Sequence, residues 1–292
     1  MNGLFVIDKP GGITSHDVVN RLRKITGERS IGHLGTLDPM ATGVLPLLLG
    51  KFTRLAQFFS SAEKSYSGTI RFGFATDTYD ADGEIVGERT LPQLAAEAVR
   101  AAASRFHGEM QQMPPPYSAK KIAGTPAYKL ARAGKEVELK PSLVRIDSFE
   151  IVALNGDQAT FVMRLSAGGY VRSIAHELGQ ALGCGAHLSS LRRTQAGVFT
   201  IADAHALDEL QLLAGNAEAL EECGVHPRGL LPVMPSVTAD AQTIGRLRNG
   251  AQANLPEFSS APMVKVFASQ HDLFAIATRV AGTLFQPTVV LG

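Results

Sequence analysis

The spacing of apolar residues in the first half of the chain predicts alternating strands and helices. Residues 3–10, GLFVIDKP, form an apolar run that ends at Lys9-Pro10 and predicts a strand. We expect Ser15 to cap a helix, because apolar residues recur after it at helical spacing, at Val18, Val19, Leu22 and Ile25. The same criteria predict strands at 44–49 and 64–74 and helices at 53–59 and 94–106.

The second half carries a hairpin signal, a further helix and a break between two domains. Asn155-Gly156-Asp157 separates two strand-like runs and predicts a β-hairpin. Residues 170–183, YVRSIAHELGQALG, predict an amphipathic helix that ends at a glycine. The Pro-rich stretch GLLPVMPSV indicates a boundary between domains 1–234 and 235–292. Beyond it, a helix at 240–249 and short β-like runs predict a small β-rich module.

Composition narrows the class of protein. The chain has 292 residues, of which 45% are apolar, enough for a globular core. It has no apolar run long enough for a membrane helix and its first residues lack the pattern of a signal peptide, so we expect a soluble, cytoplasmic protein without a membrane partner. Two cysteines, Cys184 and Cys223, are too few for a disulfide framework or a zinc site.

The near-neutral net charge of +1 hides a local basic excess. Residues 1–145 hold 19 Lys and Arg against 14 Asp and Glu, whereas residues 146–292 hold 9 against 13. The densest basic stretch is 117–140, which includes a short predicted helix at 127–133 and interleaves tyrosines with Lys120, Lys121, Lys129 and Arg132. Such a stretch suits contacts to RNA phosphates and bases, or forms an ordinary solvated helix face. Further candidate RNA contacts are Lys9, Arg21, Arg23 and Lys24.

Common catalytic motifs are absent from the sequence. Gly50-Lys51 is followed by Phe52 rather than Ser or Thr, which excludes a phosphate-binding P-loop. The stretch HELGQ starts at His176 but has Gln180 where a zinc protease needs its second histidine. Nucleotide hydrolysis and metal-dependent proteolysis are therefore disfavoured, and we expect no metal site.

A single acid, Asp38, stands in the stretch GHLGTLDPMATGVLPLLLG at 32–50. Asp before Pro commonly forms a turn, which is its structural interpretation. A functional interpretation requires a cation that keeps the carboxylate ionised, and Arg172 at the start of a predicted helix is a candidate. The spacing of Asp38 and Arg172 does not show whether they meet.

The stretch around Asp38 closely resembles the catalytic motif of the bacterial tRNA pseudouridine synthase B family. VIDKPGGITSHDVV at 6–19 resembles the N-terminal motif of that family, and KSYSGTIRFG at 64–73 its active-site tyrosine strand. Residues 114–134 resemble its RNA-contacting insertion, and residues 168–197 its arginine segment with the Leu-Arg-Arg-Thr that follows. Five motifs in the right order are far more specific than any one of them.

The resemblance implies an α+β fold: a pseudouridine synthase domain with a mixed, mainly antiparallel central sheet flanked by helices, an RNA-contacting insertion at about 114–140, and a C-terminal PUA-like RNA-binding domain. It implies Asp38 as the nucleophile, Tyr66 stacked on the target base, and Arg172 paired with Asp38. It also implies substrate contacts from His33, Tyr170 and Leu191. The implied substrate is the T stem-loop of tRNA, modified at tRNA position 55, with no cofactor and no obligate protein partner, so we expect a monomer.

Pseudouridine formation breaks the N1–C1′ bond of a flipped-out uridine and rejoins the base through C5. Asp38 would act on C1′, as the nucleophile of a retaining glycosidase does, or assist loss of the 2′ proton; the sequence leaves both routes open. A non-catalytic RNA-binding or tRNA-folding protein is the alternative function. A glycosidase would need a second acid near Asp38, and we interpret the acids of DTYDADGE at 77–84 as turn residues.

Overall fold

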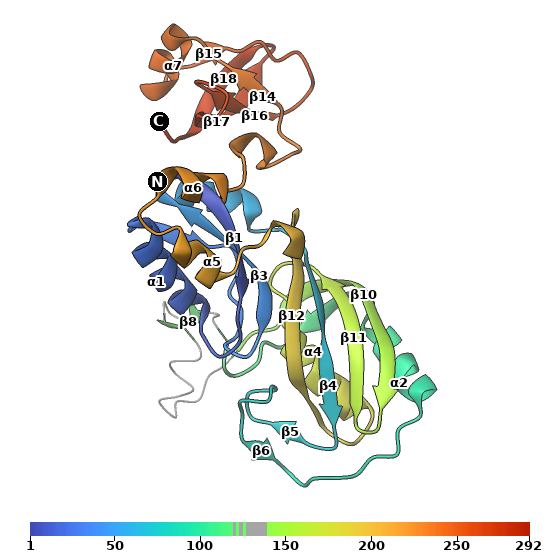
Figure 1. The fold of residues 1–292 in the computed structure, drawn as a ribbon. Coiled ribbons are helices and arrows are strands. Elements are labelled where there is room, and N and C mark those ends of the chain that lie inside the picture. The colour runs from blue at the N-terminus through green and yellow to red at the C-terminus, as the bar shows by residue number, and fades with distance from the viewer. Residues whose placement is uncertain (119–120, 123–124, 127–138) are drawn as a thin grey trace.

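A mixed β-sheet forms the centre of the larger part of the molecule. The computed structural model describes residues 1–118, 121–122, 125–126 and 139–292. Within them the strands follow the order β1-β3-β12-β4-β11-β10-β7, with β2 beside β3 and β13 beside β12 (Figure 1). Neighbouring strands run antiparallel except β3 and β12, so the predicted mixed, mainly antiparallel sheet is confirmed. The strands are β1 (Gly3–Lys9), β2 (Ile31–His33), β3 (Thr42–Leu49), β4 (Lys64–Phe72), β7 (Gly108–Gln112), β10 (Ser142–Asn155), β11 (Gln158–Leu165), β12 (Ala186–Ala196) and β13 (Phe199–Thr200).

Helices and short ribbons surround this sheet. The α-helices of the larger part are α1 (Ser15–Thr26), α2 (Ala96–Ala103), α4 (Val171–Ala181), α5 (Leu207–Leu212) and α6 (Ala217–Glu222). The 3₁₀ helices are η1 (Gly50–Phe59), η2 (Ser104–Phe106), η3 (Ile201–Asp203) and η4 (Pro227–Gly229). Two-residue strands form the ribbons β5 (Ala75–Thr76) with β6 (Ile85–Val86), and β8 (Lys121–Ile122) with β9 (Thr125–Pro126). The helix expected at 127–133 lies outside the described residues.

Helix α1 follows the predicted pattern but begins one residue earlier than expected. The side chain of Thr14, rather than Ser15, caps it: the Thr14 hydroxyl accepts from Asp17 N, and the Asp17 carboxylate accepts from Thr14 N. Ser15 is instead buried, and its hydroxyl exchanges hydrogen bonds with the backbone of Leu37. The helix thereby joins the loop that carries Asp38.

The hairpin and helix of the second half were also predicted correctly. Asn155 and Gln158 are the last pair of the β10–β11 ladder, and Gly156 adopts a positive φ of 60° in the turn between them. Helix α4 starts directly after the turn that follows β11 and packs its apolar residues into the core of the sheet domain. Its first turn contains Arg172, which is directed toward the loop before β3.

A second sheet lies at one end of the molecule, beyond α6 (Figure 1). Its strands are β14 (Ser236–Thr238), β15 (Ala253–Asn254), β16 (Met263–Phe267), β17 (Leu273–Ala281) and β18 (Leu284–Val290), and α7 (Ala241–Arg248) packs against it. One apolar cluster continues across both sheets: Val44 and Phe52 of the larger part belong to it together with Phe267, Ile276 and other residues of the smaller part. Burial of this shared surface favours a fixed arrangement of the two sheets.

Candidate active site

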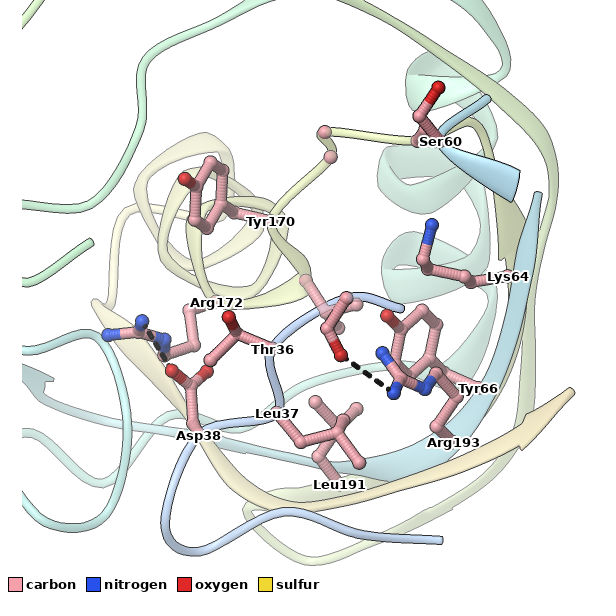
Figure 2. Close-up of a pocket in the computed structure, with 15 residues that line it drawn as sticks. Thr36, Leu37, Asp38, Ser60, Lys64, Tyr66, Tyr170, Arg172, Leu191 and Arg193 are labelled. Atoms are coloured by element: carbon pink, nitrogen blue, oxygen red, sulfur yellow. Dashed lines mark hydrogen bonds and ion pairs between the residues drawn. The ribbon is translucent and has the colours of Figure 1, made fainter. Parts of the chain in front are cut away.

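The cavity of about 290 Å³ beside the Asp38 loop gathers five of the six predicted catalytic and substrate-binding residues (Figure 2). Its walls come from the loop between β2 and β3, strands β4 and β12, and the start of α4. The sequence-predicted residues that line it are Asp38, Tyr66, Tyr170, Arg172 and Leu191. Residues as far as 158 positions apart in the sequence, Gly35 and Arg193, therefore meet at a single cavity.

Arg172 is tied to Asp38 and to the segments around it. Its Nη2 donates to Asp38 Oδ1 at 2.8 Å and to the Tyr117 carbonyl at 3.0 Å, and its Nη1 donates to the Thr78 carbonyl at 2.9 Å. The arginine is 4% exposed, whereas the Asp38 side chain is 31% exposed and faces the cavity. The buried cation thus holds an accessible carboxylate in one orientation.

A second carboxylate lies on the same guanidinium, which corrects the interpretation of DTYDADGE as turn residues only. Asp80 is 4% exposed, and its Oδ2 lies 3.5 Å from Arg172 Nη1. Its Oδ1 accepts from the Thr78 hydroxyl at 2.5 Å and from Asp82 N at 3.1 Å. Asp80 does not line the cavity, so the one carboxylate among the described residues that line it is Asp38.

Several polar contacts fix the loop that carries Asp38. The Asp38 carbonyl accepts from Ala41 N at 3.1 Å, so the Asp-Pro pair does form a turn. Ser15 Oγ donates to the Leu37 carbonyl at 3.0 Å and accepts from Leu37 N at 2.8 Å. Asp38 therefore fits both interpretations: its backbone forms the turn, and this turn directs its side chain into the cavity.

Lys9, expected to contact RNA, is buried below this loop. Its exposed fraction is 0%, and its Nζ donates to the carbonyls of Pro10, Pro39 and Ala41 at 2.9, 3.1 and 2.7 Å. An RNA phosphate cannot reach an ammonium group in this position, so the expectation for Lys9 was wrong. Burial lowers its pKa to about 8, and the Asp38 carboxylate opposes this shift. Lys9 instead supports the backbone of the Asp38 turn.

Opposing influences act on the Asp38 carboxylate. Burial raises its pKa above the ordinary value, and the negative charge of Asp80 adds to this. The Arg172 guanidinium, by charge and by hydrogen bond, acts in the other direction, as does Lys9. The site thus combines an apolar setting, which makes a carboxylate less solvated and more reactive, with cations that favour its ionised form.

Tyr66 and Leu191 supply the apolar walls. Tyr66 on β4 and Leu191 on β12 lie on neighbouring strands of the sheet and are 8% and 7% exposed. Burial raises the pKa of the Tyr66 hydroxyl, and the Arg193 guanidinium beside it opposes that shift. An aromatic face and an aliphatic side chain in one small cavity can hold a planar base and exclude water.

The remaining predicted residues differ in position. Tyr170 lines the cavity at the start of α4, where its backbone N–H and carbonyl both bond the side-chain amide of the buried Gln112. His33 does not line the cavity; it is the last residue of β2, and burial lowers its pKa. Lys120, Lys129 and Arg132 lie outside the described residues, as does the side chain of Lys121.

Sequence reasoning missed Asp80, Gln112, Lys64 and Arg193. The last two line the cavity. Each belongs to a stretch that was singled out for another residue: Lys64 precedes Tyr66 by two positions, and Arg193 follows Leu191 by two. Residues two apart in a strand point to the same face of the sheet. The positions of Tyr66 and Leu191 could therefore have pointed to Lys64 and Arg193.

Comparisons with known proteins agree with this geometry. The model of the TruB family pseudouridylate synthase N-terminal domain matches residues 23–171, and that of the tRNA pseudouridylate synthase B C-terminal domain matches residues 172–233. The chain is 47% identical over 294 residues to tRNA pseudouridine synthase B of Solibacter usitatus, with 100% of both chains covered. It is 39% identical over 269 residues to the protein of that name from Aquifex aeolicus, covering 91% of this chain and 92% of the relative.

A solved structure supports the fold. The structure titled as the archaeal box H/ACA sRNP Nop10-Cbf5 complex matches 99% of this chain and 86% of that chain with a TM-score of 0.71, at 23% sequence identity. None of the described helices is long and apolar enough to cross a membrane.

The family models match residues 23–233, and two relatives match over nearly their whole length. The chain therefore belongs to the TruB family of pseudouridylate synthases, enzymes that isomerise uridine to pseudouridine.

Proposed function

We propose that this enzyme isomerises the T-loop uridine at tRNA position 55, with Asp38 as the nucleophile. The observation that carries the proposal is the 2.8 Å contact of Arg172 with Asp38 in a cavity of about 290 Å³ that Tyr66 and Leu191 line. The names of the full-length relatives support tRNA as the substrate. One carboxylate, one arginine and one aromatic ring suit a reaction in which no atom is gained or lost.

The reaction breaks the N1–C1′ bond of the uridine, turns the base, and joins C5 to C1′. Asp38, ionised beside Arg172, attacks C1′ as the nucleophile of a retaining glycosidase does, or takes the 2′ proton so that a glycal forms. In both routes the electron pair of the broken bond leaves with N1. C5 then bonds to C1′: in the first route it displaces the Asp38 carboxylate from C1′, and in the second it adds to the glycal while Asp38 returns the proton to C2′. The C5 hydrogen finally departs as a proton and N1 gains one.

The walls of the cavity retain the detached base. A uridine in a folded loop must leave its stack to enter, at a cost of about a few kcal/mol. Stacking on Tyr66 offsets about 1 to 3 kcal/mol of this. Exclusion of water by Tyr66 and Leu191 suppresses hydrolysis of the reactive sugar while the base turns. Tyr170 completes the contacts at the cavity mouth, and His33 contacts the RNA outside the cavity.

The rest of the chain serves recognition of the RNA. We assign residues 1–234 to the catalytic domain, with the insertion at about 114–140 contacting the T stem-loop through Lys120, Lys121, Lys129 and Arg132. Residues 235–292 form a PUA-like RNA-binding domain. The enzyme works as a cytoplasmic monomer without a cofactor, and it recognises the shape and phosphates of the RNA loop.

Mapping of pseudouridine in an unmodified tRNA transcript tests this function. Wild type should modify the T-loop uridine and leave a transcript with cytidine at that position unmodified. Asp38→Ala and Asp38→Asn should abolish modification and retain RNA binding, whereas Asp208→Asn, which removes an exposed carboxylate on α5, should behave as wild type. Unmodified RNA after incubation with folded wild type would refute the function, and activity in Asp38→Asn would refute the role of Asp38.

A further inference from the structure

Two cationic side chains lie across the cavity from Asp38. Lys64 of β4 and Arg193 of β12 line it on the side of Tyr66, away from the Asp38 and Arg172 pair (Figure 2). They converge on Gly35: a Cβ placed on that glycine would be 3.2 Å from Lys64 Cε and 3.5 Å from Arg193 Nη1. Among the described residues, neither cation takes part in an ion pair.

Arg193 is fully buried and has an unused donor. Its Nε donates to the Val44 carbonyl at 2.7 Å and its Nη2 to the Gly35 carbonyl at 3.0 Å, so it joins the two ends of the Asp38 loop. Its Nη1 is buried and makes no hydrogen bond of good geometry in the described part of the protein, although the guanidinium lies beside the Tyr66 hydroxyl and acts on it. A buried guanidinium nitrogen without an acceptor is unfavourable, and an oxygen atom of a ligand in the cavity would satisfy it.

Lys64 is the second donor on this side. Its Nζ donates to the Ala62 carbonyl at 2.8 Å, and an ammonium group has three N–H donors. Burial and the neighbouring Arg193 lower the pKa of Lys64 to about 8. Neither of these two partly desolvated cations has a carboxylate partner within the described ranges, so an anion bound in the cavity would stabilise both charges.

The reaction itself generates an anion at this place. When the N1–C1′ bond breaks, the electron pair leaves with N1, so uracil becomes a monoanion with negative charge on its O2 and O4 atoms. This holds for attack on C1′ and for the glycal route. Arg193 pairs with Tyr66 in the β4–β12 register, so the cations lie beside the ring on which the base stacks.

We propose that Lys64, together with Nη1 of Arg193, binds the carbonyl oxygens of the detached uracil anion and so stabilises the transition state for N1–C1′ cleavage. The inference rests on the proposed function, since it requires cleavage driven by Asp38. Donors fixed where charge develops act in the way of an oxyanion hole. A backbone phosphate is the competing ligand, but Arg193 is fully buried, and a base inserted in the cavity reaches it whereas the RNA backbone outside does not.

Lys64 carries the test, because Arg193 also holds the Asp38 loop. Lys64→Met removes the charge and keeps the apolar stem, Lys64→Arg keeps the charge, and Lys51→Met removes an exposed lysine of η1 as a control. Each folded variant is compared with wild type in single turnover on a T stem-loop RNA, with the affinity for the RNA measured separately. A second RNA carries 5-fluorouridine at the target, because the electron-withdrawing fluorine stabilises the uracil anion without help from the protein. Since its C5 has no hydrogen to lose, the reaction of both RNAs is followed as disappearance of the starting nucleoside rather than as formation of pseudouridine.

Lys64→Met should lower the single-turnover rate constant about 100-fold with RNA affinity within twofold of wild type. Lys64→Arg should recover part of the rate, and Lys51→Met all of it. The deficit of Lys64→Met should shrink at least tenfold on the 5-fluorouridine RNA. A deficit of the same size on both RNAs, an unchanged rate, or weaker binding at an unchanged rate, which indicates a phosphate contact, would overturn the inference. Inactive wild type on the uridine RNA would refute the proposed function instead.

Discussion

Nη2 of Arg172 donates to Asp38 Oδ1 over 2.8 Å, while the other terminal nitrogen of the same guanidinium faces Asp80 at 3.5 Å. The arginine therefore connects an accessible carboxylate with a buried one. Carbonyl oxygens of Thr78 and Tyr117 fix its orientation further. Because Asp80 raises the pKa of Asp38 and Arg172 lowers it, the two neighbours of Asp38 are expected to shift the pH dependence of the reaction in opposite directions.

Arg172→Met should move the acidic limb of the pH–rate profile upward. In the proposed mechanism Asp38 acts in its ionised form, so the rate is expected to fall as the pH drops through the pKa of Asp38. Loss of the adjacent cation raises that pKa further and shifts the limb by about 1 to 3 pH units. Single-turnover rates between pH 5 and 9 measure the shift. An acidic limb at the wild-type position would show that Arg172 does not control the ionisation of Asp38.

Asp80→Asn should have the opposite effect on the acidic limb. The amide retains an acceptor for the Thr78 hydroxyl and Asp82 N but removes the negative charge, so the pKa of Asp38 falls. The limb should move to lower pH. Loss of the charged contact to Arg172 should also reduce the plateau rate about 10- to 100-fold, the equivalent of about 1.5 to 3 kcal/mol. An upward shift would mean that Asp80 acts on Asp38 mainly by holding Arg172.

Lys9→Met should reduce stability rather than RNA affinity. Three carbonyl oxygens lose their donor, which should lower the free energy of unfolding by about 1 to 3 kcal/mol at pH 7. The pKa of Lys9 is about 8 in the folded protein and 10.5 as the ordinary value, so between these values the unfolded state binds more protons. The contribution of Lys9 to stability therefore rises with pH over this window.

Urea denaturation of wild type and Lys9→Met at pH 7 and pH 10 measures both effects. The difference in unfolding free energy should be larger at pH 10. The affinity for a T stem-loop RNA should be the same for the two proteins, and a smaller salt dependence of binding in the variant would restore Lys9 as an RNA contact.

Local patterns predicted several of the elements but not β7 or β12, and the five family motifs in their order predicted most of the cavity. The apolar spacing of α1 and the turn at Gly156 depend on neighbours in the sequence, so the sequence alone was sufficient for them. Asp38 and Arg172 are 134 positions apart, and no local pattern shows that they meet. Their pairing was predicted through the resemblance to a family.

The errors concern side chains whose surroundings come from distant segments. Asp80 lies in a stretch rich in turn residues, which are usually exposed. It is nevertheless buried, and Arg172 in the first turn of α4 contacts its carboxylate. Lys9 precedes a proline at the end of a strand, and from the sequence we expected it at the surface. Its ammonium group instead bonds the carbonyls of Pro39 and Ala41. Burial of a polar residue depends on tertiary contacts, which composition and periodicity do not encode.

Gly43 offers a test of how strictly β3 and β12 position the Asp38 loop. It has a positive φ of 101°, and a Cβ built on it would lie 2.2 Å from the backbone oxygen of Arg193. Because Gly43 and Arg193 are partners in the parallel ladder, Gly43→Ala should push the strands apart where the loop joins β3. Gly32→Ala in β2, where a Cβ would meet nothing within 4 Å, is the matched control.

We expect Gly43→Ala to lower the unfolding free energy by about 1 to 3 kcal/mol. The single-turnover rate should fall by about 100-fold, because a displacement of about 1 Å at a reacting group has an effect of this size. Gly32→Ala should retain wild-type stability and rate. Denaturation and pseudouridine formation measured on both variants separate the two effects. A stable Gly43→Ala enzyme with the wild-type rate would show that the β3–β12 contact does not set the position of Asp38.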